Sequence, residues 1–323
     1  MSNSNQLEMM ERIALDLEGV ERALASSFNT GSEDFNTLIR PLSEAGGKRL
    51  RAQLCLLIAN AGQSVEEERI KIAEAVEMLH LATLIHDDVL DQAEIRRGEE
   101  TIHKHKGNKV AILSGDYLFA KAFRIVSEMT HMEYLKVFSH IITCLVEGEF
   151  MQMEDVYRID QGIDRYMTKT QKKTADFMEG CMELGGLLGG WSSDEIMYLK
   201  RYGHALGMAF QITDDIMDYR ETSDTTGKPV GNDLREGLLT YPLLSVVNES
   251  NQNQLLQDIK NLNHGGDEQE IIDYVIAQGG IDNTLRVAQQ YCDDALSALE
   301  SIRDFDGKEF LVLAVQNLAD RKV

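Results

Sequence analysis

The chain has 323 residues, of which 54 are Asp or Glu and 32 are Lys or Arg, so its formal net charge is −22. An acidic excess of this size excludes a protein that binds a nucleic-acid backbone through a basic surface. Most of these acids lie at helix-surface spacing and predict a solvated face. Only Pro41, Pro229 and Pro242 are prolines, and the long stretch between the first two is what extended helices require. Composition therefore predicts an all-α protein.

Cysteine spacing and apolar runs limit the class further. The cysteines lie far apart and form no C-x-x-C pair, so their spacing predicts neither a zinc site nor a disulfide framework (Cys55, Cys144, Cys181 and Cys292). No basic and apolar leader opens the sequence, and no apolar run reaches the roughly 18 to 20 residues that span a bilayer. We expect a cytoplasmic protein without a membrane span.

Helical periodicity begins near the N-terminus and returns near the C-terminus. Apolar residues recur at helical spacing in both places (Met10, Ile13, Leu17, Val20 and Leu24; Leu285, Ala288, Cys292, Ala295 and Leu299). Turn signals at 44–47, 60–62 and 106–108 separate further helices. Since no strand-like alternation, repeat or linker occurs, we predict one helical domain over residues 1–323.

Glycine marks two further features. Gly185 with Gly189, and Gly203 with Gly207, stand four residues apart in apolar helical sequence. Each pair lies on one helix face, where we expect close helix packing rather than a ligand. The polar segment 221–242 contains three glycines and two prolines and is predicted to be a flexible flap.

Two aspartate runs of identical spacing carry the chemistry. Asp87, Asp88 and Asp91 form the first run, and Asp214, Asp215 and Asp218 repeat its spacing. Residues four apart stack on one helix face, where like charges repel unless a cation compensates. Oxygen-only ligands select a hard ion such as Mg²⁺, which keeps places for phosphate oxygens. One run alone fits an accident of an acidic protein, but two in apolar helical sequence predict a diphosphate site.

Cationic residues follow the helical stretches. Most stand where a loop begins, and each taken singly fits a solvated surface charge (Lys48, Arg49, Arg51, Arg96, Arg97, Lys172, Lys173 and Lys228). Together with both aspartate runs they indicate a site for two anionic substrates.

The sequence from about Gly46 to Pro242 resembles the trans-polyprenyl diphosphate synthase family. Gly46-Gly47-Lys48-Arg49-Leu50-Arg51 resembles the family's isopentenyl diphosphate loop, and the two aspartate runs match its two aspartate-rich motifs. The resemblance implies an isoprenoid synthase bundle with a central cavity. It assigns the isopentenyl diphosphate contacts to Lys48, Arg51, His80 and Arg97, and the allylic diphosphate contacts to Arg96, Lys173, Thr174, Gln211 and Lys228. It makes the principal Mg²⁺ ligands Asp87, Asp91 and Asp214, supported by Asp88, Asp215 and Asp218. The predicted catalytic residues are these three principal ligands together with Lys173 and Arg96.

The resemblance also predicts the reaction and its product. Mg²⁺ and cationic side chains would stabilise a departing diphosphate, and isopentenyl diphosphate would attack the allylic cation and then lose a proton. Ala82 and Thr83 are small where short-chain members carry a bulky floor, so we expect a product of hexaprenyl to octaprenyl length. Family analogy implies a homodimer, or a heterodimer with a small subunit, and peripheral membrane contact.

The sequence departs from the family pattern at two positions, and other enzyme classes remain as alternatives. Ala52 replaces the family's proline, which we expect to be harmless, and Leu238 replaces a flap lysine, which removes a phosphate contact. Without the resemblance, His80 fits a hydrogen-bonded core residue. A His-Asp phosphohydrolase would use His80, His86 and Asp87, but it gives no role to the second aspartate run or to the Gly-Gly-Lys-Arg loop. A terpene cyclase of the same fold would not need the second cationic set.

Overall fold

The computed structural model describes residues 3–28, 33–44, 49–96, 98–220 and 231–319. Contacts between Cα atoms divide the chain into two compact units. Unit 1 comprises Met1–Ser139, Gly180–Met197 and Asp304–Gly307, and unit 2 comprises His140–Glu179, Tyr198–Arg303 and Lys308–Val323. Three of the five boundaries fall inside helices, namely α7 (Met132–Glu154), α9 (Asp176–Leu188) and α10 (Ser193–Arg220). The expectation of one domain over the whole chain stays a prediction.

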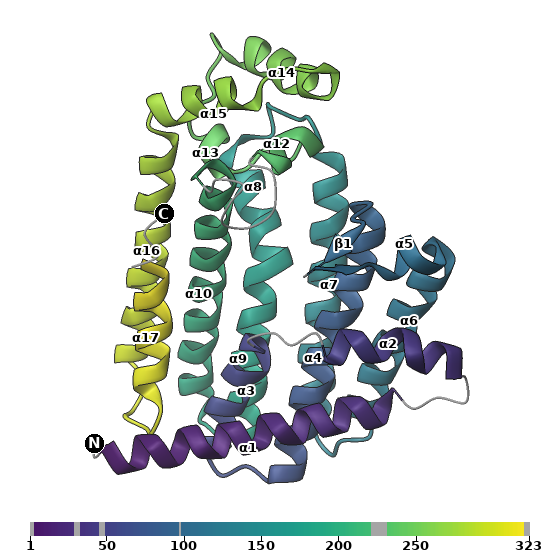
Figure 1. The fold of residues 1–323 in the computed structure, drawn as a ribbon. Helices are drawn as coiled ribbons and strands as arrows, with labels where there is room; N and C mark the ends of the chain where they lie inside the picture. Colours follow the sequence, from purple (N-terminus) through teal and green to yellow (C-terminus); the bar gives the residue numbers. More distant parts are fainter. Residues whose placement is uncertain (1–2, 29–32, 45–48, 97, 221–230, 320–323) are drawn as a thin grey trace. The chain divides into compact units, whose positions relative to one another are not determined.

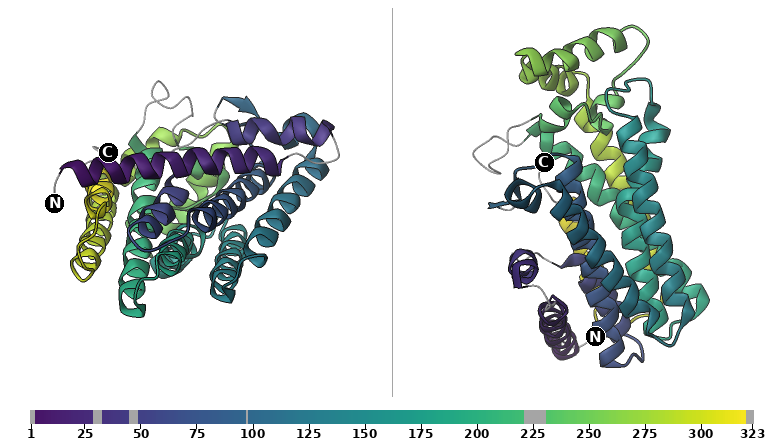
Figure 2. Two further views of the ribbon diagram at one scale, coloured as in Figure 1. Left: turned by 90° about the horizontal axis from the view of Figure 1, so that it is seen from below. Right: turned by 90° about the vertical axis from the view of Figure 1, so that its right-hand side faces the viewer.

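Unit 1 is built on the helix that carries the first aspartate run. Helix α4 (Glu66–Leu90) begins with three glutamates, whose charges favour a helix N-terminus. Helix α6 (Asn108–Ser127) runs alongside α4, and α1 (Asn3–Ser27) lies across α3 (Leu50–Asn60) and α4 (Figure 1; Figure 2). The unit also contains α2 (Glu33–Glu44), α5 (Ile102–Lys106) and a hairpin of β1 (Ile95–Arg96) and β2 (Glu99–Glu100).

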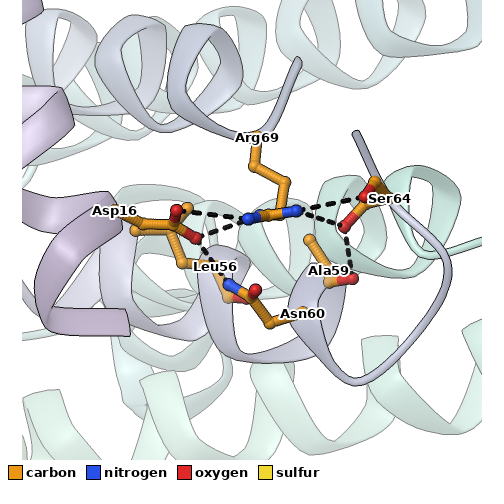
Figure 3. A network of polar contacts seen from close by, with 6 residues as sticks. All are labelled: Asp16, Leu56, Ala59, Asn60, Ser64 and Arg69. Atoms are coloured by element: carbon orange, nitrogen blue, oxygen red, sulfur yellow. Dashed lines mark hydrogen bonds and ion pairs between the residues drawn. The ribbon is translucent and has the colours of Figure 1, made fainter. Parts of the chain in front are cut away.

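A buried polar network joins α1, α3 and α4 (Figure 3). Asp16 on α1 receives hydrogen bonds from Arg69 Nε at 3.0 Å, Arg69 Nη2 at 3.2 Å and Asn60 Nδ2 at 2.6 Å. Arg69 Nη1 donates to the Ser64 carbonyl at 3.1 Å. Buried charges are tolerated when they are paired and hydrogen-bonded, so this network fixes α1 on the helices that carry the candidate site.

Unit 2 carries the second aspartate run on α10. Its apolar core includes Ile212 and Ile216 of α10, which are fully buried beside that run. Helices α16 (Gly280–Glu300) and α17 (Lys308–Ala319) run side by side (Figure 1). The remaining elements are α8 (Gly162–Thr170), the π-helix η1 (Gln171–Ala175), α12 (Asn232–Glu236), α13 (Tyr241–Leu244), α14 (Gln252–Asn261), the 3₁₀ turn η2 (Leu262–His264) and α15 (Glu268–Ala277).

The all-α prediction is confirmed. Helix α3 ends at Asn60, and Gly107 separates α5 from α6, as the turn signals predict. In the described residues the sheet is limited to the four residues of β1 and β2. The predicted flap 221–242 falls partly outside them, at 221–230, and its remainder includes the short helix α12. None of the described helices combines the length and the apolar character that a membrane crossing needs.

Candidate functional site

The first aspartate run occupies the C-terminal end of α4. Asp87 is half-buried and Asp91 is exposed, whereas Asp88 is buried and accepts a hydrogen bond from Arg96 Nε at 2.6 Å. Burial raises the pKa of the Asp88 carboxyl, and the Arg96 guanidinium opposes that rise. The last turn of α4 contains no basic residue, so the helix dipole adds to the negative potential there. A cation at Asp87 and Asp91 would relieve this potential.

The second run separates one exposed aspartate from two that the protein holds. Asp214 is exposed. Asp215 is buried, and it accepts hydrogen bonds from Tyr166 Oη at 2.5 Å and Gln211 Nε2 at 3.0 Å. Asp218 accepts the backbone amides of Asn232 and Asp233, both at 3.1 Å, and so fixes the start of α12. Burial raises the pKa of both Asp215 and Asp218 to about 6.

The carboxylates of each run, taken by itself, are donors that suit a hard divalent cation. Within α4, Asp87 and Asp91 lie one turn apart on one face, and both offer carboxylate oxygens. Asp214 offers the same donor from unit 2. Mg²⁺ prefers such oxygens together with water and phosphate oxygens. The carboxylates of Asp88, Asp215 and Asp218 are used in protein hydrogen bonds, so they are better suited to position the runs than to contribute ligands.

Unit 1 brings Arg51 and His80 together. Arg51 Nη1 lies 3.4 Å from His80 Nε2, and burial lowers the pKa of the Arg51 guanidinium. Lys48 and Arg97, predicted to act with them, lie outside the described residues, as does Lys228 of the flap. Glu77 accepts Arg49 Nη1 at 3.0 Å and the Ala52 amide at 3.4 Å. The proline that the family usually has at position 52 could not donate that hydrogen bond.

A π-helix presents the predicted allylic contacts of unit 2. The segment η1 contains Lys173 and Thr174, and π-turns often occur at functional sites. Thr174 Oγ1 donates to Gln211 Oε1 at 2.9 Å, and the Gln211 amide donates to Asp215. Lys173 Nζ lies 2.6 Å from Glu149 Oε1. Thr174, Gln211 and Asp215 therefore form one chain of hydrogen bonds, which Tyr166 joins at Asp215.

Close backbone contact holds the π-helix in place. A Cβ atom at Gly207 would lie 2.6 Å from Ala175 Cα, which requires glycine in α10. Likewise, a Cβ atom at Gly185 would lie 2.6 Å from the carbonyl oxygen of Cys55. Both glycines therefore serve helix packing, as predicted.

The two positions predicted to set product length differ in environment. Thr83 is half-buried and stands one turn before Asp87, on the same face of α4, and its Oγ1 donates to the His80 carbonyl at 2.7 Å. Ala82 is completely buried. A bulky residue at 83 is therefore better tolerated than one at 82.

Several supporting residues escaped the sequence analysis. Glu77 interrupts an apolar stretch of α4, Tyr166 binds Asp215 from α8, and Glu149 pairs with Lys173. Lys169 is buried, and burial lowers the pKa of its ammonium group. The charges of Asp155 and Asp215 act in the opposite direction and raise that pKa. For Glu77 alone the sequence carries a signal, a charged residue within an apolar helical stretch.

The contacts of His86 and His103 give no support to the metal set of a phosphohydrolase. His86 Nε2 lies 3.1 Å from the Ile112 carbonyl, and a Cβ atom at Gly115 would lie 2.2 Å from that nitrogen. His103 Nε2 lies 2.7 Å from the Ala93 carbonyl. Both rings therefore pack within unit 1.

Comparison with known proteins decides the family. A model of the polyprenyl synthetase family matches residues 32–278. The chain belongs to the polyprenyl synthetase family. It is 32% identical over 312 residues to the octaprenyl diphosphate synthase of Escherichia coli, covering 95% of this chain and 96% of the relative. It is also 32% identical to heptaprenyl diphosphate synthase component 2 of Geobacillus stearothermophilus, covering 89% of this chain and 90% of that protein.

Solved structures of polyprenyl synthases have the same fold. Heptaprenyl diphosphate synthase of Staphylococcus aureus superposes with a TM-score of 0.88 at 28% identity, covering 96% of this chain and 99% of that one. The polyprenyl synthase of Caulobacter crescentus, solved with calcium and isoprenyl diphosphate, has a TM-score of 0.88 at 30% identity, covering 100% and 98%. This polyprenyl synthetase is therefore a prenyltransferase with the all-α isoprenoid synthase fold.

Proposed function

We propose that this synthase condenses isopentenyl diphosphate with an allylic diphosphate in an Mg²⁺-dependent reaction and releases a medium- or long-chain all-trans polyprenyl diphosphate. The observation that carries the proposal is the division within each aspartate run. Asp91 and Asp214 are exposed, whereas Asp88 and Asp215 are buried and accept hydrogen bonds from Arg96 and Tyr166. Such a division provides metal ligands on a rigid support.

In this proposal Asp87, Asp91 and Asp214 hold the metal ions. Bound Mg²⁺ would neutralise the diphosphate and favour its departure as the allylic C–O bond breaks. Asp88, Asp215 and Asp218 keep the ligands oriented through Arg96, Tyr166 and the first amides of α12.

Cationic side chains bind the two diphosphates. Lys173, Arg96 and Lys228 contact the allylic diphosphate with Thr174 and Gln211, and Arg51, His80, Lys48 and Arg97 contact isopentenyl diphosphate. Arg96 pairs with the Asp88 carboxylate, and Lys173 pairs with the Glu149 carboxylate and donates to Gln152 Oε1 at 2.9 Å. A diphosphate must compete with these partners for the two cations.

The reaction needs no protein nucleophile. The C–O bond of the allylic diphosphate breaks, and its electron pair leaves with the diphosphate. The double bond of isopentenyl diphosphate then forms a new C–C bond to the allylic cation. A proton leaves the adjacent carbon to restore an alkene, with the released diphosphate as acceptor.

Small residues before Asp87 support a long product. Thr83 is half-buried and lies about 6 Å along the helix from Asp87, roughly one extended prenyl unit. The names of the relatives support the same range, since they include octaprenyl, heptaprenyl and solanesyl diphosphate synthases.

An exposed apolar stripe on α7 supports a dimer. Val146, Phe150 and Met153 recur at helical spacing and are 47%, 62% and 58% exposed. The relative named component 2 indicates that a second subunit is an alternative to a homodimer. Phe150→Glu should lower the mass measured by light scattering, whereas Leu313→Glu, which changes an exposed apolar residue of α17, should not. An unchanged mass for Phe150→Glu would contradict this interface.

Product analysis tests the proposed reaction. Purified protein is incubated with Mg²⁺, farnesyl diphosphate and isopentenyl diphosphate, and the products are separated by length. We expect chains of hexaprenyl length or longer, and their loss in Asp87→Ala. Release of phosphate without isopentenyl diphosphate, and without elongation, would instead support a hydrolase.

A further inference from the structure

Unit 2 contains a compact group of metal-binding side chains apart from the aspartate runs. His140 and Cys144 stand one turn apart on α7, and Asp176 is the first residue of α9. One ligand atom from each lies within 4.8 Å of the other two. Cys144 Sγ lies 3.6 Å from His140 Nε2 and 3.8 Å from Nδ1. We propose that His140, Cys144 and Asp176 form a second metal site, which binds a thiophilic divalent ion of the Zn²⁺ type.

The sulfur and nitrogen ligands already have the spacing of an occupied site. Zinc bonds of about 2.0 to 2.3 Å in a tetrahedron place neighbouring ligand atoms about 3.3 to 3.8 Å apart. The present separation of sulfur and nitrogen already falls in that range. Small side-chain rotations would therefore complete the site, and a water molecule would fill the fourth position.

The donor types select the ion. A thiolate and an imidazole prefer Zn²⁺ to Mg²⁺, which takes oxygen ligands. The site thus differs in kind from the all-carboxylate runs of α4 and α10. Sequence spacing alone could not reveal it, because Asp176 is far along the chain from Cys144.

The site is buried, and an ion bound there must displace the proton that the Cys144 thiol holds. Cys144 and Asp176 are 4% and 7% exposed. Burial, together with a hydrogen bond to Asp176, raises the pKa of the Cys144 thiol to about 12. On metal binding the S–H bond breaks, the proton passes to the solvent buffer, and a metal–sulfur bond forms. The nearby Lys172 is held by Glu147 at 2.5 Å, and Gln171 Nε2 donates to Asp176 Oδ1 at 3.3 Å, where it orients the carboxylate.

A neighbouring group shares Asp176 but is less suited to the ion. Asp176, Glu179 and His204 also have ligand atoms within 4.8 Å. Glu179, however, already lies 3.5 Å from Lys200 Nζ and 3.6 Å from His204 Nδ1. Because the Lys200 ammonium already lies beside this carboxylate, we assign the ion to the group that contains the thiol.

Equilibrium dialysis of the full-length protein against Zn²⁺ in excess Mg²⁺ tests the site. The parent for these measurements carries Asp87→Ala and Asp214→Ala, so that the aspartate runs do not bind the metal. We expect one Zn²⁺ per chain, and Co²⁺ in its place should give a thiolate-to-metal charge-transfer band. Cys144→Ser should abolish the band and weaken Zn²⁺ binding by more than about 100-fold, beyond the loss typical of changes around the ligands.

Matched variants separate the alternatives. His140 is exposed, so His140→Gln should weaken Zn²⁺ binding without disturbing the core. Cys292→Ser, which changes another buried cysteine of unit 2, and His204→Gln should leave binding unchanged. Circular dichroism of each zinc-free variant checks its fold. Absence of stoichiometric Zn²⁺ on the parent, or binding lost in His204→Gln but kept in His140→Gln, would overturn the proposal.

Discussion

The buried network of Asp16 and Arg69 gives a test of what fixes α1 to the helices of the candidate site (Figure 3). Asp16→Ala removes the acceptor of three hydrogen bonds and leaves the Arg69 guanidinium, itself 8% exposed, without its carboxylate. Breaking a buried ion pair from one side costs about 3 to 5 kcal/mol, because an uncompensated charge stays buried. That is a large share of the roughly 5 to 15 kcal/mol by which a protein domain is stable.

A double variant makes the prediction specific. In Asp16→Ala with Arg69→Met, both charges are gone and Asn60 keeps its bond to the Leu56 carbonyl. The double variant should therefore be more stable than Asp16→Ala alone. Glu18→Ala on the same helix is the matched control, because its ion pair with Arg22 is exposed and should contribute less than about 1 kcal/mol.

The free energy of unfolding, measured in urea for all four proteins, is the readout. A loss below about 1 kcal/mol in Asp16→Ala, of the size expected for exposed pairs, would refute the reasoning. A double variant less stable than the single one would refute it equally.

Three further predictions concern product length, pH and the π-helix. Thr83→Phe should shorten the product found by product analysis, and Ala82→Phe should do so while also losing about 1 to 3 kcal/mol of stability through overpacking; unchanged products in both would contradict the length argument. Burial raises the pKa of Glu74, so the folded chain holds that proton more tightly than the unfolded chain, and ionisation lowers stability as pH rises above about 4.3. In urea unfolding, the free energy of unfolding of Glu74→Gln should therefore rise relative to that of the parent between about pH 4 and pH 7. An equal difference in free energy at both pH values would count against burial as the cause. Gly207→Ala should displace Ala175 and the π-helix and raise the KM for the allylic substrate more than that for isopentenyl diphosphate, and equal KM changes would argue against this role.

The sequence was sufficient to predict the aspartate runs but not how each carboxylate is used. Identical spacing in two helical stretches identified both runs, because one turn of helix places residues four apart on one face. The tethering of Asp215 by Tyr166, and of Asp218 by the amides of α12, depends on partners remote in sequence.

Residues that are adjacent in the sequence do not always take part in the same site. His86 stands next to Asp87, but its ring packs toward the Ile112 carbonyl of α6. The π-helix around Lys173 has no signal in composition, since it arises where α8 continues into α9 over the Gly207 contact. Periodicity predicts helices, and tertiary contacts determine their irregular turns.

The central claim is that the exposed aspartates Asp91 and Asp214 hold the catalytic metal. It is tested by measuring the incorporation of isopentenyl diphosphate as the Mg²⁺ concentration is increased. The measurement compares the parent with Asp91→Ala, Asp214→Ala and Asp194→Ala, the last of which removes an exposed acid from α10 away from the run. We predict that Asp91→Ala and Asp214→Ala shift the Mg²⁺ dependence to higher concentration and lower the maximal rate, while Asp194→Ala matches the parent. An Mg²⁺ dependence unchanged in Asp91→Ala and Asp214→Ala would contradict the account.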